Sequence, residues 1–537
     1  MAAELTSAES ESESWEHLSP SPNGRPFTRW AAALAVGGPL VIFALHASLY
    51  GWWVVDDAAI TWAYARSIAE GAGPVLQPGV PAAEGWSNTS WLLIFILAAR
   101  VGAPFVVLTK VLALLCAAGT FAALWSAARF VLSARRAAVA ACVAGVTAAL
   151  VPSWVAWSVS GLEAPLYALI VASLAALCVR ARTGSLQVAT AAGVLASIAS
   201  LTRPDGIVYA AAYPLAVVVA LRRDSVRSVA VSLVAWALPV GAYLTWRWVR
   251  FGTLLPNTAI AKAQGAPTWG PLSEFGLYGL ILVPVAAVTI FSWVRSPRYR
   301  SELAALAVVA VLALSAYAVL EPDWMGQFRF AAPLWPVAAL LGAVAAATTS
   351  RTVCIALIVA VAVLGVPSWV SSAMTFRDSP TVPACLVAQI NGAEMNAYAA
   401  VGGIPTSGTL LVPDVGGAAL VGRLRVVDLA GLAEPTIARF MASGNMAGLR
   451  AFVFERVRPT FVSVHGAWGQ QTGVANDPRL RRDYELVAQR PDGQVWVRRD
   501  VVTSGTLEAM RTVRRDQAAL EAQVRSAPRA RCSLEPA

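Results

Sequence analysis

The sequence predicts a polytopic α-helical membrane protein with about eleven transmembrane helices and a C-terminal α/β domain outside the cytoplasm. Hydrophobic residues make up 57% of the 537 residues and charged residues only 13%, whereas roughly a quarter of a soluble protein is charged. Apolar runs follow one another from Trp30 to Met374 without a long polar break. Beyond Met374 the charged residues return, as in a soluble domain.

Residues 1–29 are predicted to be a disordered cytoplasmic segment. Glutamates lie among serines in this stretch, and its hydrophobicity is too low to form a core. An acidic start also argues against a cleaved secretory signal. The first apolar run, which begins near Trp30, is therefore expected to remain as a membrane anchor.

Residues 30–374 are predicted to form the transmembrane domain. A helix needs about 20 apolar residues to cross roughly 30 Å of hydrocarbon. The run from Trp91 to Ala99 is too short and is predicted to be a helix on the outer surface. Eleven runs are long enough, and they begin near Trp30, Pro104, Ala137, Leu162, Leu186, Ile207, Val229, Pro271, Ser301, Phe328 and Arg351.

Clusters of arginine predict the orientation of these spans. With the N terminus in the cytoplasm every inner loop is positive, as the positive-inside rule requires. The net charge of +10 is then explained by topology, and no nucleic-acid partner is expected. The predicted location is the cytoplasmic (inner) membrane. The inner arginines are Arg129, Arg135, Arg136, Arg180, Arg182, Arg222, Arg223, Arg227, Arg295, Arg298, Arg300 and Arg351.

Residues 375–537 are predicted to be a small extracytoplasmic α/β domain. Strand-like runs at 409–412, 425–429 and 460–464 alternate with helical stretches at 434–441 and 446–456. Cys385 and Cys532 lie at the two ends of this domain. An oxidising compartment permits a disulfide between them, but the sequence leaves this pairing open.

Two adjacent carboxylates, Asp56 and Asp57, are the strongest chemical signal. They begin the outer loop 52–103 directly after the first span, where charge next to hydrocarbon is costly unless it is functional or paired. Two neighbouring like charges raise the pKa of one of them, which suits a general base. The alternative is that Asp57 only caps the helix that follows it.

Cationic residues on the outer face are few, and they suit a phosphate at a low-dielectric boundary. Lys262 follows a turn-like stretch, and Arg203 lies between two spans. The alternative for Arg203 is an ion pair with Asp205 or another outer carboxylate. For Arg247 and Arg250, anchoring of the side chains at the membrane interface is favoured.

A set of short motifs runs in a fixed order along residues 50–470. In this order they resemble the GT-C glycosyltransferases that use polyprenyl-phosphate-linked sugars, particularly the mycobacterial terminal arabinofuranosyltransferase type. The motifs are Asp56-Asp57-Ala58-Ala59-Ile60 with Tyr64-Ala65-Arg66, Glu84-Gly85-Trp86-Ser87-Asn88, Ser160-Gly161-Leu162-Glu163, Thr202-Arg203-Pro204-Asp205-Gly206, Leu255-Pro256-Asn257-Thr258 with Lys262, Asp323-Trp324-Met325 with Arg329, Asp414-Val415-Gly416-Gly417 and Val427-Asp428-Leu429-Ala430-Gly431-Leu432.

The resemblance implies a GT-C fold with a catalytic outer loop at 52–103. It implies transfer of a sugar, with arabinofuranose as the leading candidate, from a polyprenyl-phosphate donor in the bilayer to a glycan or lipid-linked acceptor of the cell envelope, with inversion. Asp56 or Asp57 would be the base, and Arg203, Lys262 and Arg329 would bind the donor phosphate. The residues implied in substrate binding are Tyr64, Arg66, Glu84, Trp86, Asn88, Glu163 and Asn257.

No cofactor is required by this reading, although the adjacent carboxylates are compatible with a divalent metal. The competing function is a transporter or flippase for a lipid-linked sugar. No inverted repeat is visible in the sequence, and the interiors of the spans are almost free of charge. Carriers usually place polar groups or broken helices near the midplane, so the transferase is favoured.

Overall fold

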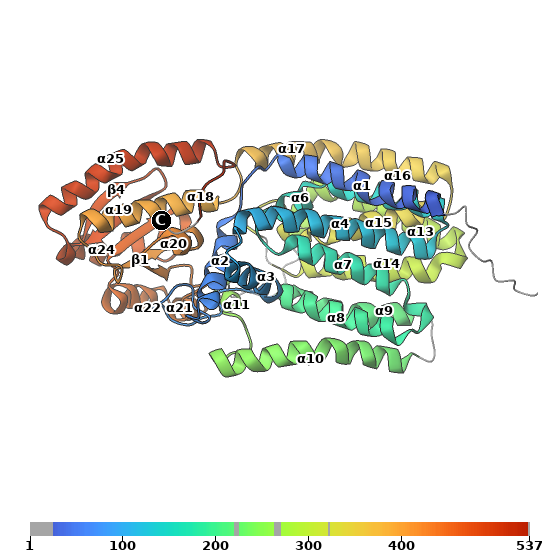
Figure 1. Ribbon diagram of the computed structural model, residues 1–537, viewed down its shortest axis with the longest axis horizontal. Coiled ribbons are helices and arrows are strands. Elements are labelled where there is room, and N and C mark those ends of the chain that lie inside the picture. Colours follow the sequence, from blue (N-terminus) through green and yellow to red (C-terminus); the bar gives the residue numbers. More distant parts are fainter. Residues whose placement is uncertain (1–24, 220–224, 263–269, 321–322, 535–537) are drawn as a thin grey trace, which may run out of the picture.

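The protein consists of a helical bundle and an α/β domain joined end to end (Figure 1). The computed structural model describes residues 25–219, 225–262, 270–320 and 323–534. The predicted disordered segment 1–29 lies outside these residues except for its last five. Those five belong to helix α1, which begins at Arg25.

The bundle contains a helical segment for each of the eleven predicted spans. Among the described residues, seven helices are long and apolar enough to cross a membrane. The number is eight if α5 and α6 (Pro152–Ser158), which meet at an angle of 72°, form one span. Three shorter apolar segments account for the other predicted spans. They are α8, η3 together with α9, and α15. The segments are α1 (Arg25–Ser48), α4 (Phe105–Val131), α5 (Ala134–Leu150), α7 (Ala164–Cys178), α8 (Leu186–Thr202), η3 (Pro204–Ala211) with α9 (Ala212–Val219), α10 (Val226–Phe251), α13 (Leu282–Arg295), α14 (Arg300–Ala318), α15 (Leu334–Ala347), and α16 (Arg351–Leu364) with α17 (Val366–Asp378).

Helix α15 is apolar on every side because it lies inside the bundle. Its residues from Leu334 to Ala346 are all buried, as expected for a helix surrounded by other helices. The helices α1, α10 and α16, in contrast, expose large apolar side chains such as Leu45, Leu238 and Val363. These exposed apolar faces are the surface that a bilayer covers.

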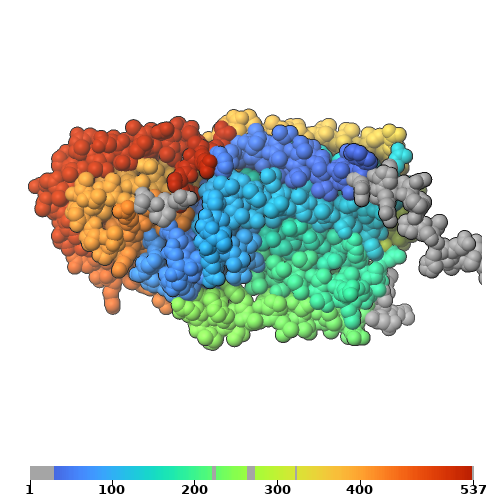
Figure 2. All heavy atoms as spheres, in the orientation of Figure 1, coloured from blue at the N-terminus to red at the C-terminus, as the bar shows by residue number. Residues whose placement is uncertain are grey.

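Three short helices lie at the junction between the bundle and the α/β domain (Figure 1): α2 (Asp56–Ala69), α3 (Thr89–Arg100) and α11 (Asn257–Lys262). Helix α3 contains the run from Trp91 to Ala99, so the predicted short helix is present. In Figure 2 the blue atoms of the outer loop fill the junction on the face shown. The polar loops therefore meet at one end of the bundle.

The α/β domain contains one five-stranded sheet of order β2-β1-β3-β5-β4. Strands β1 (Thr409–Val412), β2 (Arg425–Asp428) and β3 (Phe461–His465) are parallel, whereas β4 (Tyr484–Gln489) and β5 (Gly493–Arg498) form an antiparallel hairpin.

The three predicted strands are confirmed, as are the two predicted helices, which are α21 (Pro435–Ala442) and α22 (Met446–Ala451). The hairpin and the final helix α25 (Ser504–Ser526) were not predicted. The Pro491-Asp492-Gly493 turn between two β-rich runs is the signal that would have located the hairpin.

The two ends of the α/β domain are tied together by a disulfide between Cys385 and Cys532. The pairing that the sequence left open is therefore present. The first of these cysteines belongs to α18 (Ala384–Val387), directly after the linker from the bundle. The bond closes a loop that contains the whole sheet.

Candidate active site

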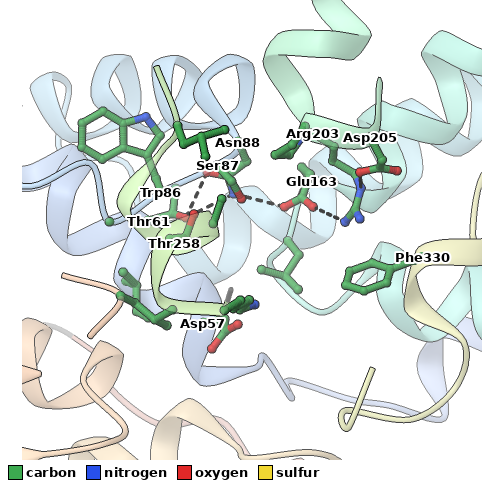
Figure 3. A pocket seen from close by; sticks show the side chains of 18 of the residues that line it. Asp57, Thr61, Trp86, Ser87, Asn88, Glu163, Arg203, Asp205, Thr258 and Phe330 are labelled. Atoms are coloured by element: carbon green, nitrogen blue, oxygen red, sulfur yellow. Dashed lines mark hydrogen bonds and ion pairs between the residues drawn. The ribbon is translucent and has the colours of Figure 1, made fainter. Parts of the chain in front are cut away.

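A cavity of about 540 Å³ lies at the junction of the bundle and the α/β domain. Its walls come from the outer loop, from α11, from the loops before α7 and after α8, and from the short 3-10 helix η6 (Arg329–Ala331). Leu432 and Ala442 of the α/β domain complete it. Figure 3 shows its polar side chains converging from these separate elements.

Asp57 projects into this cavity from the first turn of α2. The residue in the N-cap position is Val55, and no side chain caps the helix, so the alternative that Asp57 is a helix cap is wrong. Its Oδ2 lies 3.8 Å from Nη1 of Arg329. Burial raises the pKa of Asp57, and the positive charges of Lys262 and Arg329 oppose that rise.

Two cations of the cavity face this carboxylate. Arg329 is buried, forms an ion pair with Asp323 (2.7 Å) and lies over the rings of Trp157 and Phe330. Lys262, the last residue of α11, lines the same cavity and interacts electrostatically with Asp57. A negatively charged group next to Asp57 would therefore meet two positive charges.

Arg203 lines the cavity but is already compensated by two carboxylates. It pairs with Glu163 at 3.0 Å and with Asp205 at 2.9 Å. Its guanidinium also lies 4.5 Å from the ring centre of Phe330. The ion-pair alternative considered for Arg203 is therefore present in the structure.

A hydrogen-bonded chain runs along one wall of the cavity (Figure 3). Asn88 bonds to Thr61 (3.2 Å) and donates to Glu163 (3.1 Å), which accepts from Arg203. Trp86 forms the neighbouring part of the wall and donates to Thr89. Side chains held in this way keep their positions when a ligand enters.

Asp56, one residue before Asp57, faces a different part of the molecule. Its carboxylate accepts hydrogen bonds from the backbone N–H groups of Gly416 (2.9 Å) and Gly417 (2.7 Å) in the α/β domain. A Cβ on Gly416 would lie 2.1 Å from the Asp56 carbonyl oxygen, so only glycine permits this approach. Burial, followed by the charge of Asp414, raises the pKa of Asp56 well above its usual range.

Arg66 also contacts the α/β domain and does not line the cavity. It donates to the carbonyl oxygens of Leu420 and Ala419, both at 2.9 Å. Asp56 and Arg66 thus hold the two ends of α20 (Gly416–Val421) from a single helix, α2. We call this set of contacts the α2–α20 clamp.

Tyr64, Glu84 and Asn257 were predicted to bind substrate, but they lie behind the cavity wall. Tyr64 is buried against Trp86. Glu84 accepts from Arg247 at 2.6 Å and from Tyr243 at 2.6 Å, so Arg247 is an ion-pair partner and not only an interfacial anchor. Asn257 donates to the carbonyl oxygens of Gly431 and Leu432 in the α/β domain. These three residues position the loops that carry the cavity.

Seven of the predicted site residues therefore meet at one cavity: Asp57, Trp86, Asn88, Glu163, Arg203, Lys262 and Arg329. The sequence reasoning missed several lining residues, namely Thr61, Ser87, Thr258, Phe330 and Leu432. All five lie inside or directly beside a quoted motif residue, so their sequence positions were the available signal.

The comparisons with known proteins agree with this architecture. The structure is similar to ArnT from Cupriavidus metallidurans bound to undecaprenyl phosphate, with a TM-score of 0.57, 15% identity and coverage of 89% of this chain and 99% of that one. It is also similar to the oligosaccharyltransferase AglB from Archaeoglobus fulgidus in complex with an inhibitory peptide and a dolichol-phosphate, with a TM-score of 0.51, 14% identity and coverage of 88% and 74%. The chain has the GT-C fold.

One curated relative has detectable sequence similarity. The terminal β-(1→2)-arabinofuranosyltransferase of Mycobacterium tuberculosis is 29% identical over 244 residues, which are 42% of this chain and 38% of the relative. The match thus spans well under half of the relative's length. No family model matches the sequence.

Proposed function

We propose that this protein is a membrane glycosyltransferase that moves a sugar from a polyprenyl-phosphate donor to an acceptor outside the cytoplasm. The observation that carries the proposal is the placement of Asp57 in the junction cavity opposite Lys262 and Arg329. A carboxylate beside two cations, next to apolar helices, suits a reaction that takes a proton and releases a lipid phosphate.

In the proposed reaction Asp57 is the general base. It accepts the proton of an acceptor hydroxyl while that oxygen bonds to the anomeric carbon of the donor sugar. The bond from that carbon to the phosphate oxygen breaks, and its electron pair stays on the phosphate. Attack opposite the leaving group inverts the anomeric centre, and Lys262 and Arg329 stabilise the new phosphate charge.

Arg203 is proposed to act with these cations mainly as a fixed part of the wall. Its ion pairs with Glu163 and Asp205 offset its charge and hold its guanidinium in place. Trp86 and Asn88 would contact the sugar, because an indole face packs on sugar C–H groups and an amide bonds to hydroxyls.

The donor and acceptor are inferred by similarity. Undecaprenyl phosphate and dolichol-phosphate are the lipids in the two structures that share this fold, which supports a polyprenyl-phosphate donor. Arabinofuranose as the transferred sugar rests on the mycobacterial relative. A glycan or lipid-linked molecule of the cell envelope is the proposed acceptor.

We place the cavity on the extracytoplasmic side of the cytoplasmic membrane. Arg351, one of the predicted inner arginines, is the first residue of α16, which begins at the end of the bundle away from the α/β domain (Figure 1). The disulfide between Cys385 and Cys532 also favours an oxidising compartment. A reporter enzyme that is active only outside the cytoplasm should work when fused after Ala537 and fail when fused at Gly184.

The reaction is proposed to need no divalent metal. Among the described residues no group of three or more His, Cys, Asp and Glu side chains could hold one. The adjacent carboxylates also face apart, since Asp56 binds the backbone of α20. Transfer is therefore expected to persist in EDTA, and a strict requirement for added Mg²⁺ or Mn²⁺ would contradict this.

The decisive experiment measures the rate at which the purified protein transfers sugar from synthetic polyprenyl-phosphate sugars to a panel of acceptors. Asp57→Asn should lower the transfer rate by about 10²- to 10⁴-fold while leaving donor binding and the thermal midpoint close to wild type. Asp56→Asn should instead lower the thermal midpoint, because the two backbone N–H groups bond to different carboxylate oxygens and an amide has only one acceptor oxygen. If no donor is turned over and vesicles show lipid-linked sugar crossing the membrane with all variants, the protein is a transporter.

A further inference from the structure

A second cavity, of about 210 Å³, lies within the α/β domain. Asp414, just after β1, and His465, the last residue of β3, both line it. Strand β2 pairs with one edge of β1, and β3 pairs with the opposite edge of β1. This reversal of strand order opens a crevice at the carboxyl ends of the strands, where open α/β sheets bind ligands.

The charged groups of this second cavity are balanced in pairs. His465 Nε2 lies 2.7 Å from Asp414 Oδ2. The buried Arg490 pairs with Glu394 at 3.0 Å, and Asp492 pairs with Arg525 at 3.2 Å. A free anion in this cavity would lie close to carboxylates. The cations in these pairs already have a carboxylate partner. The cavity is therefore suited to a neutral molecule that exchanges hydrogen bonds.

The opposite wall is apolar. It consists of the linker and the helix that follows it, with Val382, Pro383, Leu386, Val387 and Ile390. A cavity with one apolar wall and several polar groups matches a sugar ring, which has C–H faces and hydroxyl edges. At roughly 30 Å³ per water molecule, its volume equals about seven waters and has room for one monosaccharide, not for a polyprenyl chain.

Two residues that line this cavity have unusual backbone surroundings. Gly493 faces His465 across the β3–β5 pair, and a Cβ there would lie 2.6 Å from the Cβ of His465. Val382 has a φ of +23°, a strained conformation for a β-branched residue. The carbonyl oxygen of Val382 accepts a hydrogen bond from the Asp56 N–H at 3.0 Å. The strained wall is thus attached to the start of α2, next to Asp57.

The second cavity is electrostatically linked to the first. The charge of Asp414 contributes to the raised pKa values of both Asp56 and Asp57, behind burial as the main cause. The hydrogen bond from the Asp56 N–H to Val382 also connects the two cavities, because Val382 lines the second cavity and Asp57, the next residue after Asp56, lines the first.

We infer that this second cavity binds one sugar residue of the acceptor glycan, so that a neighbouring residue of the same glycan reaches Asp57. This inference rests on the proposed function in one respect, namely that the bound glycan is the acceptor of the transfer. The binding of a neutral sugar at Asp414 and His465 does not depend on it.

The test is binding of short oligosaccharides to the purified full-length protein. Trisaccharides built of arabinofuranose, of mannose or of galactose are added separately, and the binding of each is measured by ligand-observed NMR. At least one should bind, and an equal concentration of inorganic phosphate should not displace it. Leu386→Trp fills the cavity without changing its charge and should weaken binding at least tenfold. The matched control, Leu520→Trp on the exposed face of α25, should leave binding unchanged.

Transfer kinetics then connect the cavity to the acceptor. Leu386→Trp should raise KM for the trisaccharide acceptor about tenfold, with kcat and KM for the donor unchanged and no effect on a single-sugar acceptor. His465→Gln, a smaller change, should reproduce this if the tryptophan variant fails to fold.

The two proposals fail in different ways. If wild type binds a trisaccharide and Leu386→Trp loses it, yet no donor is turned over, the transferase is wrong and the sugar site stands. If donor is turned over but both cavity variants bind and use trisaccharides like wild type, or wild type binds none, the sugar site is overturned.

Discussion

At the residue scale, the main result is the separation of Asp56 from Asp57. The two carboxylates are adjacent, yet one binds the backbone of the α/β domain and the other faces the junction cavity. Successive residues of an α-helix point about 100° apart, so α2 can present one to each partner. The same packing explains the small residue two positions after Asp57, since the Cβ of Ala59 lies 2.9 Å from where a Cβ on Gly416 would stand.

The pKa of Asp57 predicts the acid side of the pH–rate profile. A base must be ionised to accept a proton, so activity is lost as the pH falls through its pKa. Because burial raises the pKa of Asp57, this loss should occur above the range of an ordinary aspartate, about 3.9. Measurement of kcat/KM between pH 4 and 8 checks this.

The charge of Lys262 also affects the pKa of Asp57. Its charge lowers the pKa of Asp57, so Lys262→Met should move the acid limb of kcat/KM to higher pH as well as weaken donor binding. Lys262→Arg keeps the charge and should leave the limb near its wild-type position. An identical limb in Lys262→Met and wild type would contradict the proposed pairing.

At the element scale, helix α2 joins the two parts of the molecule. The α2–α20 clamp holds α20 at both ends, and Gln77 adds a bond to the Ala419 carbonyl oxygen at 3.2 Å. None of these contacts lies in the cavity. They determine where Leu432 and Ala442, which complete it, are placed.

Loss of the clamp should therefore reduce activity from outside the cavity. Arg66→Met removes two charge-assisted hydrogen bonds and leaves the two carbonyl groups without that donor, at a cost of about 2 kcal/mol. A lower thermal midpoint and slower transfer are expected, with unchanged donor binding. Arg456→Met, at an exposed position of the same domain, is the matched control and should have no effect. Equal midpoints for the two variants would show that the clamp does not stabilise the joint.

At the scale of the whole molecule, the cavity exists because the bundle and the α/β domain meet. The bundle supplies the cations and the outer loop supplies the carboxylate, whereas the α/β domain closes the remaining side. The disulfide between Cys385 and Cys532 holds that domain together across 147 residues of sequence.

Removal of this disulfide should loosen the α/β domain. The double variant Cys385→Ser, Cys532→Ser should lose about 2–4 kcal/mol of unfolding free energy, seen as a lower thermal midpoint that no longer responds to reductant. Cys142→Ser changes a cysteine of the bundle that is not in a disulfide and should retain the wild-type response to reductant.

The sequence by itself determined the helices and three strands of the α/β domain, and it predicted an orientation of the spans in the membrane. These are local properties, because the length of an apolar run, a cluster of arginines and a short β-rich segment depend on neighbouring residues. It also named seven residues of the junction cavity, since they lie in polar loops at one end of the spans. It missed the β4–β5 hairpin and α25, which are short or polar and carry weak patterns.

Only the tertiary structure decided which predicted residues face the cavity. Asp56, Tyr64, Arg66, Glu84 and Asn257 look like site residues in sequence, yet they hold the scaffold together. The partners of Asp56 are 360 and 361 residues away along the chain. Contacts over such distances depend on how the bundle and the α/β domain pack, and no local pattern records that packing.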